Sequence, residues 1–227
     1  MNDFVQKATR DLIILHKKTK VCRAQTNLCV EGFPRSANTF CVDFLTYLCN
    51  ENNHQLNIAH HTHSPLNVEL AIALEKPCLV LIREPKQAIT SHAIYSGARI
   101  PIVVQRYLDF YAEIKKWNPS ILIADFNIVI SDMNHIIAKI NQRYGLDIPF
   151  SKDVAKDGTH IGMVAKKRAR VRHSDDKERL IRTVGSPTPE REKLKDMIRP
   201  KVTDYIASRA EVMKKYNLIR QLDNYIT

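Results

Sequence analysis

Hydrophobic positions along this 227-residue chain alternate between two patterns. Short runs of consecutive apolar residues are typical of buried strands, and longer stretches with apolar positions three and four residues apart are typical of helices. Strands are predicted at 27–33, 56–60, 78–82 and 120–126. Helices are predicted at 2–19, 39–50, 67–76, 86–96, 102–117 and 133–145, and a C-terminal helix is predicted to begin at Thr188-Pro189.

Strands that alternate with helices predict a single α/β domain over residues 1–227, with a central parallel sheet flanked by helices, as in P-loop NTPases. Ligands of such sheets bind at the carboxyl ends of the strands. The residues that follow Phe33, His60, Ile82 and Phe126 are therefore the first candidates for a site. Residues 151–187 are polar, basic and weakly periodic, and we expect a long excursion there, followed by a helical region over 188–227.

Composition narrows the class of protein. Hydrophobic residues make up 44% of the chain, which excludes wholesale disorder. The formal net charge of +11 indicates an anionic partner such as a nucleotide, an acidic saccharide, a nucleic acid or a membrane surface. No apolar run approaches the ~20 residues that a membrane span requires. Five cysteines without C-x-x-C spacing, and no signal peptide, predict free thiols and a cytoplasmic location.

One segment resembles a phosphate-binding loop with altered residues. From Gly32 the spacing matches the P-loop pattern G-x-x-x-x-G-K-[ST], but Ala37 replaces the second glycine and Asn38 replaces the lysine. A strand, a turn and a helix N-terminus present backbone N–H groups and a dipole that attract an oxyanion. Arg35 adds a permanent positive charge inside the loop. The next central strand ends at Arg83 rather than at the carboxylate that a Mg²⁺ site would need.

The loop sequence "FPRSANTF", residues 33–40, resembles the 5′-phosphosulfate loop of sulfotransferases that use 3′-phosphoadenylyl sulfate (PAPS). That family has the pattern aromatic-Pro-Lys-Ser-Gly-Thr-Thr-Trp. The matching positions are Phe33, Pro34, Ser36 and Thr39. The departures are Arg35 for Lys, Ala37 for Gly, Asn38 for Thr and Phe40 for Trp.

Two further segments resemble the same family in the same order. "LIREPKQAITSH" is similar to its 3′-phosphate segment, a strand that ends in Arg-x-Pro with a serine eight residues after the arginine, here Arg83 and Ser91. "HTHSP" is similar to its Lys-Thr-His-Leu-Pro, whose histidine is the catalytic base. That histidine corresponds to His63, and His61 takes the place of the lysine.

The resemblance implies a PAPS-dependent sulfotransferase with no metal, which transfers a sulfuryl group to a hydroxyl or amine of a small molecule or saccharide. His63 and Arg35 would be catalytic. The donor would contact the loop residues Arg35, Ser36, Ala37, Asn38, Thr39 and Phe40, together with Arg83 and Ser91.

The family also closes its site with a late Arg-Lys-Gly segment, which this chain lacks. Lys166, Lys167 and Arg168 are candidates to replace it, although the default interpretation of the basic run 166–172 is a solvated or mobile face. A role of this run in binding an acidic acceptor is a further option. Phe126 is a weaker candidate for stacking on adenine.

Other interpretations remain open at this point. A divergent P-loop kinase would fit the loop spacing, but Asn38 in the lysine position and Arg83 at the strand end weigh against it. A nucleic-acid-binding module would fit the charge, but the basic run lacks interleaved aromatics, and no nucleic acid is expected. Zinc at His60, His61 and His63 would need a fourth ligand for which no suitable spacing exists.

Overall fold

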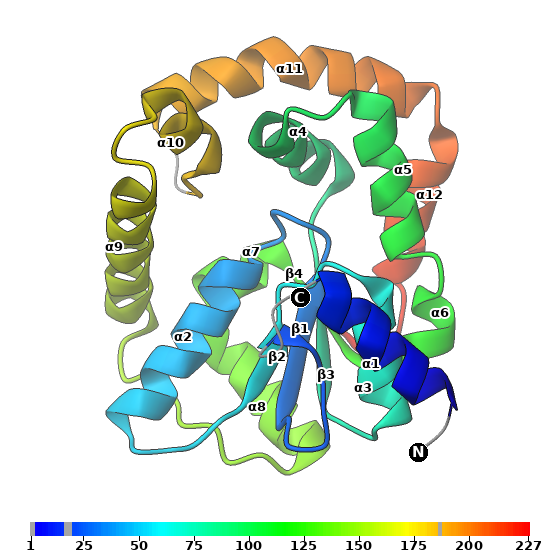
Figure 1. The fold of residues 1–227 in the computed structure, drawn as a ribbon, viewed down its shortest axis with the longest axis vertical. Coiled ribbons are helices and arrows are strands. Elements are labelled where there is room, and N and C mark those ends of the chain that lie inside the picture. The colour runs from blue at the N-terminus through cyan, green and yellow to red at the C-terminus, as the bar shows by residue number, and fades with distance from the viewer. Residues whose placement is uncertain (1–2, 16–19, 186–187) are drawn as a thin grey trace.

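The computed structural model describes residues 3–15, 20–185 and 188–227. Within them, five strands form one all-parallel sheet in the order β2-β1-β3-β4-β5, with helices on both faces (Figure 1). The strands are β1 Leu28–Gly32, β2 Ile58–His60, β3 Cys78–Ile82, β4 Leu122–Asp125 and β5 Tyr225–Ile226. The predicted single α/β domain with a flanked parallel sheet is confirmed, and the arrangement is consistent with a P-loop-like fold.

Twelve α-helices lie in the described part of the chain. They are α1 Asp3–Leu15, α2 Asn38–Glu51, α3 Pro65–Ala73, α4 Pro85–Ser96, α5 Ile100–Phe110, α6 Ile114–Trp117, α7 Phe126–Ser131, α8 Met133–Tyr144, α9 Val154–Arg172, α10 Lys177–Thr183, α11 Pro189–Ala207 and α12 Ala210–Ile219. Figure 1 shows α11 lying across α4 and α5, with α10 and α9 following the same side of the molecule down toward α2.

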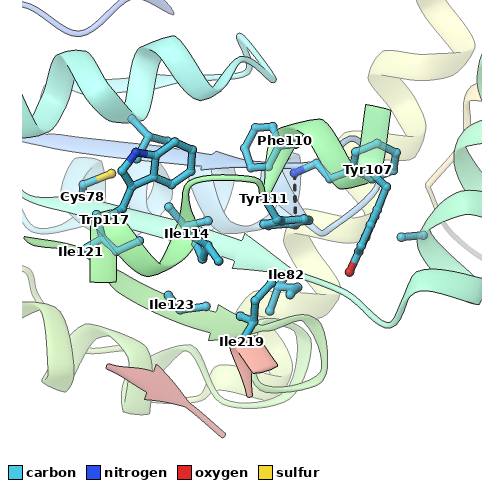
Figure 2. Packing of buried hydrophobic residues seen from close by; sticks show 14 of the residues in the cluster. Cys78, Ile82, Tyr107, Phe110, Tyr111, Ile114, Trp117, Ile121, Ile123 and Ile219 are labelled. Carbon is cyan, nitrogen blue, oxygen red and sulfur yellow. Dashed lines mark hydrogen bonds between the residues drawn. The ribbon is translucent and has the colours of Figure 1, made fainter. Parts of the chain in front are cut away.

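Alternate residues of each strand enter two separate cores, because successive side chains of a strand point to opposite faces. Leu79 and Leu81 of β3 pack with α2 and α8, whereas Val80 and Ile82 pack with α3, α4 and α5. The second core includes a group of aromatic residues, with Tyr107, Phe110, Tyr111 and Trp117 close to Ile82 and Ile123 (Figure 2). The sheet is therefore buried on both faces, as its uninterrupted apolar runs predict.

Several predicted element boundaries change. The four predicted strands are present; β3 has the predicted bounds, the other three are shorter, and the two-residue β5 was not predicted. The helical stretch 102–117 is interrupted after Phe110 and gives α5 and α6. Phe126 does not end a strand but begins α7, which Asp125 caps by accepting from the Asn127 N–H. Of the predicted helix 2–19, residues 2 and 16–19 lie outside the described residues.

The expected excursion over 151–187, for which no helix was predicted, is largely helical; its residues 186–187 lie outside the description. Asp153 begins α9 by accepting from the Lys156 N–H. Ile161 is the single buried residue in this 19-residue helix. A helix with almost no apolar stripe gives no hydrophobic periodicity, so the pattern along the sequence could not reveal it.

The strand order places a topological switch point beside β1. The chain leaves β1 toward β2 on one side and returns to β3 on the other, so the connections that follow β1 and β3 diverge and leave room for a ligand between them. The loop before α2 and Arg83 both lie at this point. No described helix is long and apolar enough to cross a membrane.

Candidate anion-binding site

The loop that joins β1 to α2 departs from the ordinary backbone region twice. Arg35 and Ala37 have φ angles of 73° and 68°, in the left-handed region that non-glycine residues rarely adopt. Strain of this kind costs about 1–3 kcal/mol per residue and is typical of functional sites. Gly32 is needed for a different reason, because a Cβ there would lie 2.6 Å from the Leu81 carbonyl oxygen. The loop therefore begins where β3 leaves no room for a side chain on β1.

Asn38 holds the loop from inside. Its side chain is buried, and its Nδ2 donates to the Phe33 carbonyl oxygen at 3.1 Å. It thus has a structural role in place of the cationic role that a lysine has in a P-loop. Ala37 precedes α2 and provides no side-chain cap, so the first N–H groups of α2 are left to an external acceptor.

The Ser91 hydroxyl accepts hydrogen bonds from two arginines. It accepts from Arg35 Nε at 3.2 Å and from Arg191 Nη2 at 3.1 Å. Arg83 joins them, since its Nη1 donates to the Arg35 carbonyl oxygen at 3.2 Å. The structure therefore brings together Arg35, Arg83 and Ser91, which the sequence singled out, and adds Arg191, which it did not. We call Arg35, Arg83, Arg191 and Ser91 the arginine cluster.

The arginine cluster contains positive charge with no ion-pair partner, although Glu84 and Glu192 act on Arg83 and Arg191 from beyond ion-pair distance. In the described part of the chain, no Asp or Glu oxygen lies within 4.0 Å of a guanidinium nitrogen of the three arginines. Burial, with the charge of Arg191 second, lowers the pKa of Arg35 to about 10. Burial also lowers the pKa of Arg83 to about 10. Desolvated like charges in one place indicate that an anion is missing from their surroundings.

The end of α10 gives the cluster partial compensation. Arg35 donates to the carbonyl oxygens of Thr183 and Val184, both at 3.3 Å. Arg191 donates to those of Ile181 and Arg182. The last carbonyls of a helix lack partners within it and carry partial negative charge, so they are suitable acceptors for arginine. They fix the side chains without neutralising them.

Phe126 lies directly against Arg83. The Arg83 guanidinium carbon is 3.8 Å from the centre of the Phe126 ring, a cation–π contact. The structure thus places Phe126 beside the cluster, and its stacking on adenine stays a prediction.

A buried carboxylate organises the segment that follows β2. Glu31 of β1 is fully buried. Its Oε1 accepts from the Thr62 N–H, the Thr62 hydroxyl and the Asn67 amide, and its Oε2 accepts from the His63 N–H, all at 2.8–2.9 Å. His61 and His63 have left-handed φ angles of 59° and 53°. Glu31 therefore holds a strained segment in place, and we call Glu31 with residues 61–63 the histidine segment.

Only one ring nitrogen of His63, Nδ1, has a hydrogen-bond partner among the described residues. Its Nδ1 lies 2.8 Å from the Gly32 carbonyl oxygen. A carbonyl only accepts hydrogen bonds, so Nδ1 must carry the proton, and the lone pair of a neutral ring is on Nε2. Within the described residues no hydrogen bond occupies that Nε2. The arrangement is suited to a proton acceptor.

His61 differs from His63 because both of its nitrogens have partners. Nε2 lies 2.9 Å from the Thr39 hydroxyl, and Nδ1 faces Nδ1 of His60. Burial lowers the pKa of His61 to about 3 and that of His60 to about 4, so both rings are neutral near pH 7. The contact with Thr39 joins the histidine segment to the start of α2.

The remaining predicted contacts lie on α2 and α9. Lys166 and Lys167 are exposed on α9, and Arg168 forms an ion pair with Asp43 of α2. Phe40 packs against Phe44 and lies close to Gly158 of α9. Arg168 and Phe40 thus lie where α9 faces α2, and contact of any of these residues with a donor stays a prediction.

The sequence analysis did not identify two residues of the site, Glu31 and Arg191. Glu31 did leave a signal, because a lone carboxylate inside an apolar strand run must be satisfied by buried donors. Arg191 left none: at the start of α11 it reads as an ordinary surface residue, yet its side chain is 1% exposed.

Among the described residues no group of three or more His, Cys, Asp or Glu side chains is placed to hold a metal ion.

No protein-family model matches the chain, and no curated protein matches it at a significant level.

Proposed function

We propose that the chain is a sulfotransferase that moves a sulfuryl group from PAPS to a hydroxyl or amine of an acceptor. The observation that carries the proposal is that Arg35 and Arg191 both donate to the Ser91 hydroxyl, while Arg83 donates to the Arg35 carbonyl oxygen beside them. The cluster lies beside an oxyanion-binding loop at the switch point of the sheet, and it lacks a carboxylate partner. Two anion sites side by side suit a donor with phosphate groups at both its 3′ and 5′ positions.

Each group of residues has a distinct binding role in this proposal. Arg83, Ser91 and Arg191 hold the 3′-phosphate of the donor, with Arg191 as the late basic residue for which Lys166, Lys167 and Arg168 are the other candidates. The uncapped N–H groups of α2 and the Thr39 hydroxyl hold the 5′-phosphosulfate. Arg35 connects the two sites, because its backbone belongs to the loop and its side chain reaches Ser91. When bound, the donor supplies an activated sulfuryl group.

His63 acts as the general base. Its Nε2 takes the proton of the acceptor hydroxyl or amine, while the hydrogen bond from Nδ1 to Gly32 keeps the ring in the required tautomer. Negative charge that develops on the leaving phosphate and on the sulfuryl oxygens is stabilised by Arg35, Thr39 and the loop N–H groups, which are already oriented. A phosphate leaving group is a weak base, so it needs no proton from the enzyme.

The carboxylate at the end of β4 supports this proposal over a kinase. Asp125 accepts from the Asn127 N–H at 2.8 Å and from the Tyr225 hydroxyl at 2.6 Å. It also lies 3.4 Å from the Tyr216 hydroxyl. A carboxylate with these partners is committed to the fold, whereas phosphoryl transfer from ATP needs one that is free to hold Mg²⁺.

Radiolabelled sulfate transfer tests the proposal. The protein is incubated with ³⁵S-labelled PAPS and pooled saccharides, phenols, steroids and lipids in the presence of EDTA, with Ser91→Ala as the control. Label is expected in one acceptor class with the wild type and at much lower level with the variant. Binding of ATP with Mg²⁺, but not of 3′,5′-bisphosphoadenosine without it, would contradict the proposal and favour a kinase.

A further inference from the structure

A second basic hollow lies between α4 and α11, next to the arginine cluster. It is a groove of about 320 Å³ lined by Arg83, Glu84, Lys86, Gln87, Thr90, Lys195, Arg199 and Thr203. Arg83 belongs to both places, but none of the other lining residues has a role in the proposed transfer. We call this hollow the α4–α11 groove.

Positive charge dominates one end of the α4–α11 groove. Glu84 caps α4, where its oxygens accept from the N–H groups of Lys86 and Gln87, and its charge offsets part of that of Arg83. Lys86 has no carboxylate within 4.0 Å among the described residues, and neither does Arg83. The Arg83–Lys86 end is therefore open to an anion.

The opposite wall is partly neutralised. Glu192 of α11 lies 2.6 Å from the Lys195 ammonium and 3.9 Å from the Arg199 guanidinium. Asp196 lies 3.2 Å from Arg199. These two basic residues thus contribute less net charge than the Arg83–Lys86 end does, and their long side chains remain able to donate to a ligand.

Thr90 provides an observation that is independent of charge. Its side chain is 2% exposed and lines the groove, yet its hydroxyl has no hydrogen-bond partner in the described structure. The Nε of Arg83 is likewise buried without a partner. A buried donor without a partner costs about 1–3 kcal/mol, so unsatisfied donors at one groove indicate that an acceptor belongs there.

We propose that the α4–α11 groove binds the phosphate or sulfate group of a compact monoester. Besides Glu84 and Gln87, the groups that line it are hydroxyl, guanidinium and ammonium donors, which suit a tetrahedral oxyanion with several acceptor oxygens. The volume is at the lower end of that of small-molecule sites, so only a short organic portion fits beside the anion. The site does not depend on sulfuryl transfer, because none of its donors except Arg83 takes part in it.

Threonine-methyl NMR can separate this groove from the arginine cluster. Inorganic sulfate, inorganic phosphate and a sugar phosphate are titrated in turn at constant ionic strength, with chloride as the control. The Thr203 methyl signal reports on the groove and the Thr39 signal reports on the loop. We expect Thr203 to shift saturably with all three probes and not with chloride.

Thr90→Val is the most informative variant because it keeps the side-chain shape and removes the hydroxyl. It should leave the free energy of unfolding unchanged or higher, since an unsatisfied hydroxyl is lost, and it should weaken the affinity measured at Thr203 about tenfold. Thr90→Ser should restore much of the affinity, and Lys86→Ala should reduce it. Ser91→Ala serves as the matched control and should leave the affinity at Thr203 unchanged.

The outcomes separate the two proposals. If Thr203 does not shift, shifts equally with chloride, or keeps its wild-type affinity in both Thr90→Val and Lys86→Ala, the groove is not an oxyanion site. A failure of 3′,5′-bisphosphoadenosine to bind would instead contradict the proposed transferase and would leave the groove result standing.

Discussion

The histidine segment and the arginine cluster differ in whether the protein itself supplies partners for their buried charged groups. Glu31 is fully buried, and four protein donors satisfy it. The three arginines donate only to hydroxyl and carbonyl oxygens, and none of them forms an ion pair with a carboxylate in the described part of the chain. The first arrangement is complete without a ligand and serves to position His63. In the proposed function the second is completed by an anion, so substitutions should separate positioning from binding.

The largest effect should come from His63→Ala. We expect turnover on any active acceptor to fall about 10²–10⁴-fold, the usual range for loss of a general base, with the affinity for 3′,5′-bisphosphoadenosine nearly unchanged. His60→Ala is the control and should have a much smaller effect. If His63→Ala keeps wild-type turnover while His61→Ala loses it, the base is His61. If none of the three matters, a carboxylate elsewhere takes the proton.

Glu31 should dominate stability rather than binding. Glu31→Ala leaves the N–H groups of Thr62 and His63 without an acceptor inside the protein, so the free energy of unfolding should fall by about 3 kcal/mol or more. Glu31→Gln keeps the shape and one acceptor oxygen and should cost less. Urea unfolding of both variants measures the difference. Equal and small losses would show that water can replace the carboxylate.

Acid should destabilise the fold through its buried histidines. Burial lowers the pKa of His60 and of His92 to about 4 and that of His61 to about 3. In the unfolded chain these rings take up protons near pH 6.5, whereas in the folded protein they remain neutral. The unfolded state therefore binds more protons, and stability should be complete above about pH 6.5 and should fall as the pH drops toward 4, by roughly 1–3 kcal/mol for each of the three rings.

His92→Phe provides the control for this pH dependence. His92 packs edge-on against Phe33 and stacks on Tyr95, so a phenyl ring suits its surroundings. The variant should show a shallower loss of stability between pH 7 and 5, a range above most carboxylate titrations. An identical slope in both proteins would show that His92 already takes up its proton when folded.

The smallest effect is expected on α9. The ion pair between Arg168 and Asp43 is largely exposed on its arginine side, so Arg168→Ala should change the free energy of unfolding by less than about 1 kcal/mol. Trypsin digestion tests whether Lys166, Lys167 and Arg168 contact the donor. We expect cleavage in this run to continue at saturating 3′,5′-bisphosphoadenosine, with Arg191→Ala as the variant that loses affinity. Protection by the nucleotide would instead indicate that α9 closes on it.

The fold was predictable to the extent that apolar periodicity determines it. The uninterrupted run of β3 identified a central strand, and the spacing from Arg83 to Ser91 identified two residues that do lie in one cluster. By contrast, α9 buries almost nothing and β5 has two residues, so neither leaves a periodic signal. Arg191 is 100 residues from Ser91, and only the packing of α11 against α4 brings them together.

The central claim is that the arginine cluster holds a phosphate, and calorimetry of two nucleotides tests it most directly. Wild-type protein is titrated with 3′,5′-bisphosphoadenosine and with 5′-AMP, which lacks the 3′-phosphate, in EDTA. We predict that the bisphosphate binds more tightly by roughly 2–4 kcal/mol, or about 30- to 1000-fold, and that Arg83→Ala removes most of this preference. Equal affinities of the wild type for the two nucleotides would contradict the account.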